Sequence, residues 1–169
     1  EDGGCVNVMQ NDCTELNGVF QGELSTCDTV ECPIPGEGDE CESAMFAVVG
    51  ANAFETNTAT PSGNPPDSSQ CSGTYLDWDD SPDVWFLFVP TSSGNVHFTT
   101  CDGSSFDTSM ALYEGECDNQ VACNGDADGD SGCQAYYSAF DYNVEAGESY
   151  YIRLGGWQAA TGSGTLTIE

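Results

Sequence analysis

Three carboxylates at alternate positions in residues 126–132 form the pattern with the clearest chemistry in this sequence. Asp126, Asp128 and Asp130 are separated by small residues and followed by serine and glycine. Calcium takes about six to eight oxygen ligands in proteins, and a flexible loop of this kind can bring several oxygens to one point. The loop is not an EF-hand, because Tyr137 occupies the position of the bidentate glutamate. The pattern predicts a calcium site, with a solvated acidic loop as the alternative.

A second acidic cluster, residues 77–83, directly precedes the most apolar run of the chain. Its carboxylates Asp77, Asp79 and Asp83 stand in a turn-like segment with a proline. Several hard oxygen ligands close together again favour calcium. The alternative is an Asp-rich turn in which the side chains cap their own backbone. Calcium is therefore the expected cofactor of this protein.

Few residues in the sequence are suited to catalysis. His97 is the only histidine, it alternates with Val96 and Phe98 as a strand residue does, and no G-x-S-x-G motif is present. Cysteine nucleophiles are excluded if all thiols are oxidised. Nothing distinguishes one pair of carboxylates from the others among the 29 acidic residues. We predict a protein that is not an enzyme.

The charge of the chain is strongly one-sided. Arg153 is the only base against 29 carboxylates, which gives a formal net charge of -28. Nucleic acids and anionic lipid surfaces are bound by clusters of lysine and arginine, so both are excluded as partners. Direct membrane insertion is not expected, because no apolar run reaches about 18 residues. For Arg153 we predict a partly buried ion pair or stacking on an aromatic ring, with ligand binding as the alternative.

Ten cysteines in a loop-rich sequence indicate five disulfides and an oxidising compartment. A zinc site is disfavoured, because C-x-x-C is absent and there is a single histidine. An extracellular or cell-surface location follows. The cysteines are Cys5, Cys13, Cys27, Cys32, Cys41, Cys71, Cys101, Cys117, Cys123 and Cys133.

Composition divides the chain into three parts. Residues 1–33 hold four cysteines and few large apolar residues, which predicts a small disulfide-held segment. Residues 34–40 are rich in proline and glycine and are expected to form a linker. In 41–169, short apolar runs alternate with glycine-rich turns, and the run 84–89 is apolar on both faces, as in a covered central strand. This part is predicted to be an all-β antiparallel sandwich.

Three motifs follow one another in the second half of the chain: Phe106-Asp107-Thr108, then Glu148-Ser149-Tyr150-Tyr151-Ile152-Arg153-Leu154-Gly155-Gly156, then Gly164-Thr165-Leu166-Thr167-Ile168. In this order they resemble the bacterial pre-peptidase C-terminal type domain, over about residues 39–169. The resemblance implies a jelly-roll-like β-sandwich of the kind found on secreted enzymes and surface proteins. Residues 5–33, with Asn17-Gly18 and Glu31-Cys32-Pro33, are similar to a short cysteine-rich repeat of bacterial surface proteins.

The resemblance carries expectations for individual residues. Asp107 matches the family's Phe-Asp-Thr motif and is expected to add a ligand to the calcium of the 126–130 loop. In such a sandwich Cys101 ends one strand and Cys133 begins an antiparallel neighbour, so a bridge between them is expected. The other expected pairs are Cys117 with Cys123, which flank a hairpin-sized loop, and Cys41 with Cys71, which close the Thr/Ser-rich segment 56–73.

These features predict a non-catalytic extracellular structural or adhesive protein, stabilised by calcium and disulfides. Its expected partner is another copy of itself: the segment 1–33 would dock on the next sandwich or add a strand to it, giving a head-to-tail filament. The alternative is an accessory carbohydrate- or substrate-binding module of a secreted hydrolase. Glycans would then be the ligands, with Trp78 and Trp157 as a sugar-stacking platform.

Overall fold

The computed structural model describes residues 38–71, 78, 80–101, 103–127 and 133–169. The predicted segment 1–33 and most of the linker 34–40 lie outside these ranges. No helix within them is long and apolar enough to cross a membrane. The described elements are η1 (Cys41–Ser43), β1 (Met45–Phe46), β2 (Gly50–Glu55), η2 (Ser68–Gln70), β3 (Val84–Phe88), β4 (Gly94–Thr99), β5 (Thr108–Glu114), β6 (Gln120–Asn124), β7 (Ala139–Val144), β8 (Tyr150–Gly156), η3 (Trp157–Ala159) and β9 (Ser163–Ile168).

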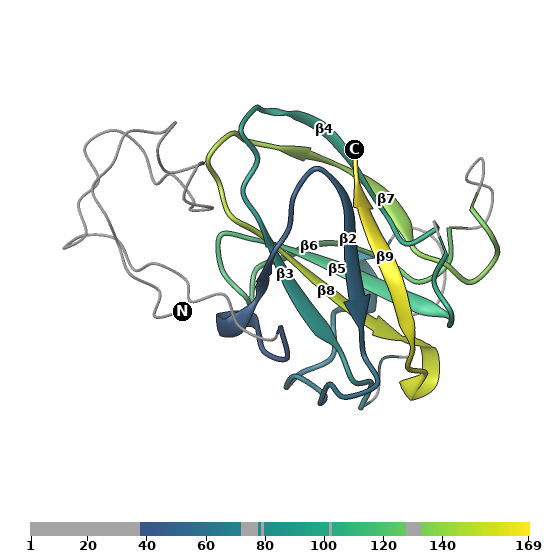
Figure 1. The fold of residues 1–169 in the computed structure, drawn as a ribbon. Coiled ribbons are helices and arrows are strands. Elements are labelled where there is room, and N and C mark those ends of the chain that lie inside the picture. Colours follow the sequence, from purple (N-terminus) through teal and green to yellow (C-terminus); the bar gives the residue numbers. More distant parts are fainter. Residues whose placement is uncertain (1–37, 72–77, 79, 102, 128–132) are drawn as a thin grey trace.

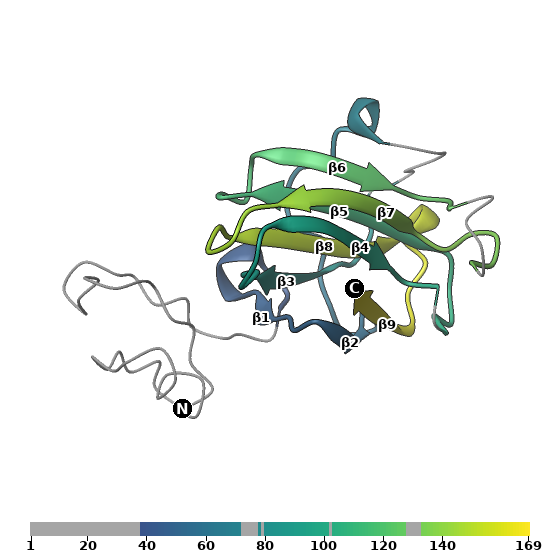
Figure 2. The same ribbon diagram turned by 90° about the horizontal axis from the view of Figure 1, so that it is seen from above.

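The described strands form two sheets, and the predicted all-β sandwich is confirmed. The five-stranded sheet has the order β1-β3-β8-β5-β6, which can be followed from one edge to the other in Figure 2. The four-stranded sheet has the order β2-β9-β4-β7, and its neighbours β2 and β9 stand side by side in Figure 1. Among the described pairs, β1 with β3 is parallel and the others are antiparallel.

Strand β3 shows why the five-stranded sheet is covered on both faces. All five of its residues are buried, as the continuous apolar run predicts. Phe86 belongs to the main core between the sheets, whereas Trp85 and Leu87 belong to a second apolar cluster on the outer face. That outer cluster includes residues of η1 and β6 as well. The segments that cover this outer face also build the cleft described below.

Aromatic rings fill the space between the two sheets. Phe88 of β3 meets Phe98 of β4 edge to face, with ring centroids 6.0 Å apart. Phe98 also lies beside Phe140 of β7, with centroids 5.6 Å apart. Burial of these rings removes a large apolar area from water and supplies much of the stability of the fold.

Three disulfides join described cysteines, and one of the three expected pairs is confirmed. Cys101–Cys133 is present, with Cα atoms 4.8 Å apart. The pairs Cys41–Cys71 and Cys117–Cys123 are wrong: the bridges are Cys41–Cys117 and Cys71–Cys123. Cys123 lies three residues into β6, which places it about 10 Å along the strand from the hairpin turn that holds Cys117. Bridged Cα atoms are usually less than about 7 Å apart. Cys123 instead faces Cys71, which forms an isolated β-bridge with it.

Candidate functional site

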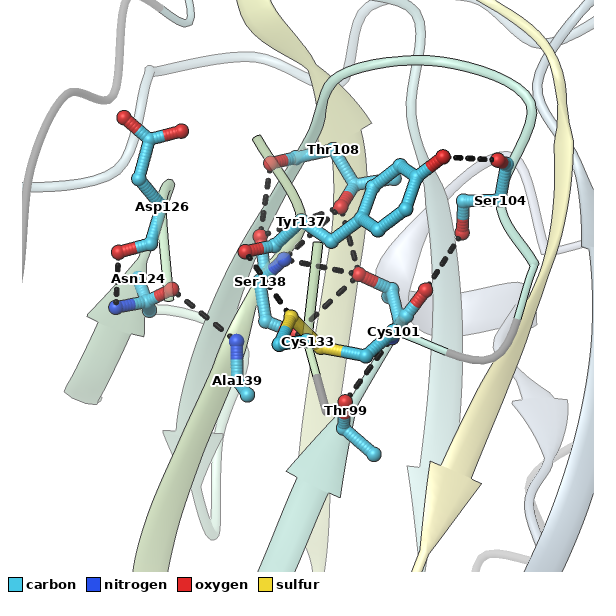
Figure 3. Close-up of a disulfide and its surroundings, with 11 residues drawn as sticks. Thr99, Cys101, Ser104, Thr108, Asn124, Asp126, Cys133, Tyr137, Ser138 and Ala139 are labelled. Atoms are coloured by element: carbon cyan, nitrogen blue, oxygen red, sulfur yellow. Dashed lines mark hydrogen bonds between the residues drawn. A yellow bond between two sulfur atoms is a disulfide. The ribbon is translucent and has the colours of Figure 1, made fainter. Parts of the chain in front are cut away.

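The corner where β4 ends and β7 begins holds both ends of the predicted calcium loop (Figure 3). The Cys101–Cys133 bridge fixes the end of the loop that leads into β7. At the other end, Asn124 donates to the backbone oxygen of Asp126 at 3.4 Å, and its own side-chain oxygen accepts from the Ala139 N–H at 3.1 Å. Asp126 is thereby held at the end of β6, next to the start of β7.

Buried hydroxyl groups line the inner side of this corner (Figure 3). Thr100 and Thr108 share a hydrogen bond of 2.6 Å between their Oγ1 atoms. Ser138 donates its N–H to Thr100 Oγ1 at 3.0 Å and its hydroxyl to the Thr108 carbonyl at 2.8 Å. All three side chains are fully buried. Their hydrogen bonds fix the start of β5, which follows Asp107 directly.

Asp107 and Asp126 lie within electrostatic reach of one another. Burial, with the nearby Asp126 charge as the smaller cause, raises the pKa of Asp107 from 3.8 to about 6. A carboxylate whose charge is opposed in this way is stabilised by a bound cation. Asp128 and Asp130 lie outside the described residues, and no group of three possible metal ligands occurs among the residues that are described. The calcium site predicted here stays a prediction, to which the structure adds the proximity of Asp107 to Asp126.

The second acidic cluster contains a buried ion pair. Asp83 is fully buried and accepts from Arg153 Nη2 at 2.7 Å and from the Ser62 hydroxyl at 2.6 Å. Asp77 and Asp79 lie outside the described residues, so calcium at this cluster remains untested. The guanidinium also donates to the backbone oxygens of Asn64 and Ser62. The predicted Arg153–carboxylate pair is confirmed.

Two indole rings flank the Arg153 guanidinium, as the predicted aromatic stacking requires. Its Cζ atom lies 4.9 Å from the Trp78 ring centroid and 5.2 Å from that of Trp85. Trp78 is only 3% exposed, and a Cβ at Gly155 would lie 2.8 Å from its Cζ2 atom. The alternative of a sugar-stacking platform formed by Trp78 and Trp157 is therefore wrong for Trp78, because its ring is buried against Gly155 and Arg153.

An open cleft of about 570 Å³ lies over the outer face of the five-stranded sheet. Its floor includes Trp85, Tyr113 and Arg153, and the Trp85 and Tyr113 ring centroids are 5.1 Å apart. Burial raises the pKa of Tyr113, and the Arg153 charge opposes that effect as the second cause. The cleft rim carries four exposed carboxylates, namely Glu40, Glu42, Asp67 and Asp118.

Covalent and polar links hold the walls of the cleft in place. Cys41–Cys117 joins η1 to the turn between β5 and β6, and Cys71–Cys123 joins the end of η2 to β6. The Gln120 side chain accepts from the Asp67 N–H at 2.8 Å and donates to the Asp67 carbonyl at 2.9 Å. These links pin the segment 62–71 against the sheet edge. The sequence analysis did not predict the cleft. The pairs Cys41–Cys117 and Cys71–Cys123 would have indicated which distant segments form its walls.

His97 lies on the surface of the four-stranded sheet. Its Nδ1 atom is 3.0 Å from Asp141 Oδ1 on the neighbouring strand β7. Both side chains are solvent-accessible, at 32% and 62% exposure. The pair is a cross-strand contact on the sheet face, as the alternation of the sequence predicts for His97.

Known proteins with similar sequence or structure add the following findings. The model of a T9SS-associated family described as galactose binding domain-like matches residues 37–168. The pre-peptidase C-terminal domain of a collagenase from Bacillus anthracis has a similar structure, with a TM-score of 0.47 and 10% sequence identity. That similarity covers 75% of this chain and 94% of the collagenase domain. No curated protein matches the chain.

Proposed function

The chain belongs to this galactose-binding-domain-like family, and on that premise we propose that it is a non-catalytic extracellular module that binds carbohydrate. The observation that carries the proposal is the cleft of about 570 Å³ on the outer face of the five-stranded sheet. Its volume lies within the range of about 300–1,000 Å³ usual for small-ligand sites. Its cross-linked walls supply the preorganised surface that lowers the entropy cost of binding.

An extracellular or cell-surface location is part of this proposal. The association of the family with T9SS supports secretion, and three disulfides among the described residues suit an oxidising compartment. Glycan binding would also serve the adhesive role predicted from the sequence. An adhesin and an accessory module of a hydrolase would both bind glycans. They differ in the protein or surface to which the module is attached. Head-to-tail assembly through residues 1–33 stays a prediction, since that segment lies outside the described residues.

The direct test is a glycan array probed with the full chain, its disulfides intact. We expect binding to a subset of neutral glycans, lost after reduction of the disulfides that hold the cleft walls. Absence of binding to every glycan on the array would contradict the proposal.

We also propose that calcium stabilises the corner formed by Asp107 and Asp126, with Asp128 and Asp130 as further ligands. The raised pKa of Asp107 beside a second carboxylate supports a cation there. Thermal melting with calcium and with a chelator tests this, because a ligand that binds only the folded state raises the melting temperature. An unchanged melting temperature at millimolar calcium would contradict it.

A further inference from the structure

The edges of the two sheets differ in how they are protected from pairing with another strand. β1, at one edge of the five-stranded sheet, is only two residues long. β6, at the opposite edge, is covered by the segment that ends at Cys71, which forms a β-bridge with Cys123. Short edge strands and covering segments are two of the ways in which proteins prevent sheet edges from pairing with other chains.

β7, at one edge of the four-stranded sheet, is protected by a side-chain hydrogen bond and by a charge. Thr100 donates its N–H to the Ser138 carbonyl in the register of the β4–β7 pair, so the even-numbered residues of β7 face β4 and the odd-numbered ones face outward. Of the outward residues, Ala139 donates its N–H to Asn124, and Asp141 carries an exposed carboxylate. A charge in the middle of an edge strand disfavours pairing with another strand.

β2, at the other edge of this sheet, has none of these protections. It is six residues long, and among the described strands it pairs with β9 alone (Figure 1). Thr56 donates its N–H to the Gly162 carbonyl in the register of the β2–β9 pair, so the even-numbered residues of β2 face β9. The backbone N–H and C=O groups of Ala51, Ala53 and Glu55 therefore point outward, and they have no backbone partner among the described residues.

The residues beside this edge are apolar and held in place. Val48 and Val49, which directly precede β2, are 62% and 72% exposed, and residues 44–54 contain no charged side chain. The buried Asn52 side chain accepts from the Val48 N–H at 2.8 Å and donates to the Val48 carbonyl at 2.8 Å. Two valines are thus fixed at the surface of a chain with a net charge of -28. Exposed apolar side chains next to an unpaired strand indicate a surface for a protein partner.

The partner of this edge must itself offer an uncharged strand with free backbone groups. β2 is the described strand with both properties, so a second copy of the chain can supply it. In an antiparallel pair of two β2 strands centred on Ala53, each Ala51 lies opposite Glu55 of the partner subunit. Every outward N–H and C=O group is then bonded, and no two carboxylates lie opposite one another. The edge is therefore complementary to itself, as a two-fold contact requires.

We propose that two copies of the chain pair through β2, which joins their four-stranded sheets into one continuous sheet across a two-fold axis. The small side chains of Ala51 and Ala53 leave room for the partner strand. Burial of the two valines adds apolar area to the backbone hydrogen bonds. This contact closes on itself, unlike the head-to-tail contact predicted through residues 1–33. It uses no residue that lines the cleft, so it is independent of the proposed carbohydrate binding.

Sedimentation equilibrium of the full chain over a range of concentrations tests the proposal. We expect a reversible equilibrium between the monomer and a species of twice the chain mass of 17.8 kDa. Repulsion between two copies of net charge -28 opposes the contact. A change from about 0.1 M to about 1 M NaCl shortens the Debye length from about 10 Å to about 3 Å, and it is expected to lower the dissociation constant of the dimer at least about tenfold.

Substitutions at the centre of the contact test the edge itself. Ala53→Asp places two carboxylates opposite one another, and we expect it to weaken the dimer at least about tenfold. Asn143→Asp adds the same charge at an exposed position of β7 and is the matched control, with a dissociation constant within about twofold of the wild type. Ala53→Pro removes an N–H that the monomer does not use but the dimer does, so it is expected to leave the chain folded and monomeric.

Hydrogen exchange distinguishes a second copy from other occupants of the edge. The amide protons of Ala51, Ala53 and Glu55 are expected to exchange at least about tenfold more slowly at concentrations where the dimer forms than in dilute solution. Protection of these amides that does not depend on concentration would show that a segment of the same chain covers the edge, and it would overturn the proposal.

Two further results would also overturn it. One is a chain that stays monomeric at the highest concentration and at high salt. The other is a dimer, or an open-ended assembly, that Ala53→Asp weakens no more than Asn143→Asp does, because the contact between copies would then lie elsewhere.

Discussion

Asp107 offers a quantitative test of the acidic corner. The pKa of its carboxyl is raised from 3.8 to about 6, first by burial and then by Asp126. The folded state therefore holds this proton more tightly than the unfolded chain, and ionisation lowers the free energy of unfolding as pH rises from about 4 through about 6. Such a difference corresponds to about 3 kcal/mol, which partial exposure to solvent reduces to about 1 to 2 kcal/mol.

Asp107→Asn removes the opposed charge. In the presence of a chelator at pH 8, we expect the variant to be more stable than the wild type by about 1 to 2 kcal/mol, with a melting temperature about 3 to 6 °C higher. At pH 4 the advantage should largely disappear, because the wild-type carboxyl is then mostly protonated. Addition of calcium should stabilise the wild type more than the variant, since the variant lacks one ligand of the proposed site.

Urea denaturation at both pH values, with and without calcium, measures these differences. Glu148→Gln removes an exposed carboxylate elsewhere and controls for the general loss of one negative charge from a chain of net charge -28. Equal stability of Asp107→Asn and the wild type at pH 8, or the same gain from Glu148→Gln, would refute the reasoning.

Three further predictions concern stability. Asp83→Asn leaves the Arg153 guanidinium buried without its counter-ion, and it is expected to lower the free energy of unfolding by about 3 to 5 kcal/mol in urea; a loss under about 1 kcal/mol would contradict the importance of the pair. Replacing Cys101 and Cys133 together by serine opens a bridge with a sequence separation of 32 and should cost about 3 to 4 kcal/mol on chain entropy, measured by calorimetry. A double variant with wild-type stability would show that the bridge does not constrain this corner. Gly155→Ala would bring a methyl group within 2.8 Å of a buried indole, so we expect a loss of about 1 to 3 kcal/mol and a change in tryptophan fluorescence; an unperturbed spectrum would place that ring elsewhere.

The strands were predictable because their signal is local. The uninterrupted apolar run from Val84 to Phe88 is typical of a strand that is covered on both faces. In the structure, all five residues of this strand, β3, are buried. The bridge Cys101–Cys133 was predictable once neighbouring antiparallel strands were assigned, because the two cysteines flank the ends of β4 and β7. The ion pair of Arg153 followed from its being the only base in an acidic chain.

The outer face of the five-stranded sheet was not predictable in the same way. Its cover comes from segments far apart in the sequence, and nothing local indicates that Cys41 meets Cys117 across 76 residues. Trp78 stands among aspartates, which suggests an exposed turn, yet its ring is buried against Gly155 and Arg153. The cleft depends on both features, so sequence patterns alone did not reveal it.

The claim that the cleft binds carbohydrate is tested most directly by filling it. Asn64 is exposed on the cleft wall, and Asn95 is exposed on β4 of the other sheet. Asn64→Trp and Asn95→Trp are therefore matched substitutions, and both would be titrated calorimetrically with the neutral glycan that binds best on the array. We predict that Asn64→Trp weakens binding by at least about tenfold and that Asn95→Trp retains wild-type affinity. Undiminished binding by Asn64→Trp would contradict the account.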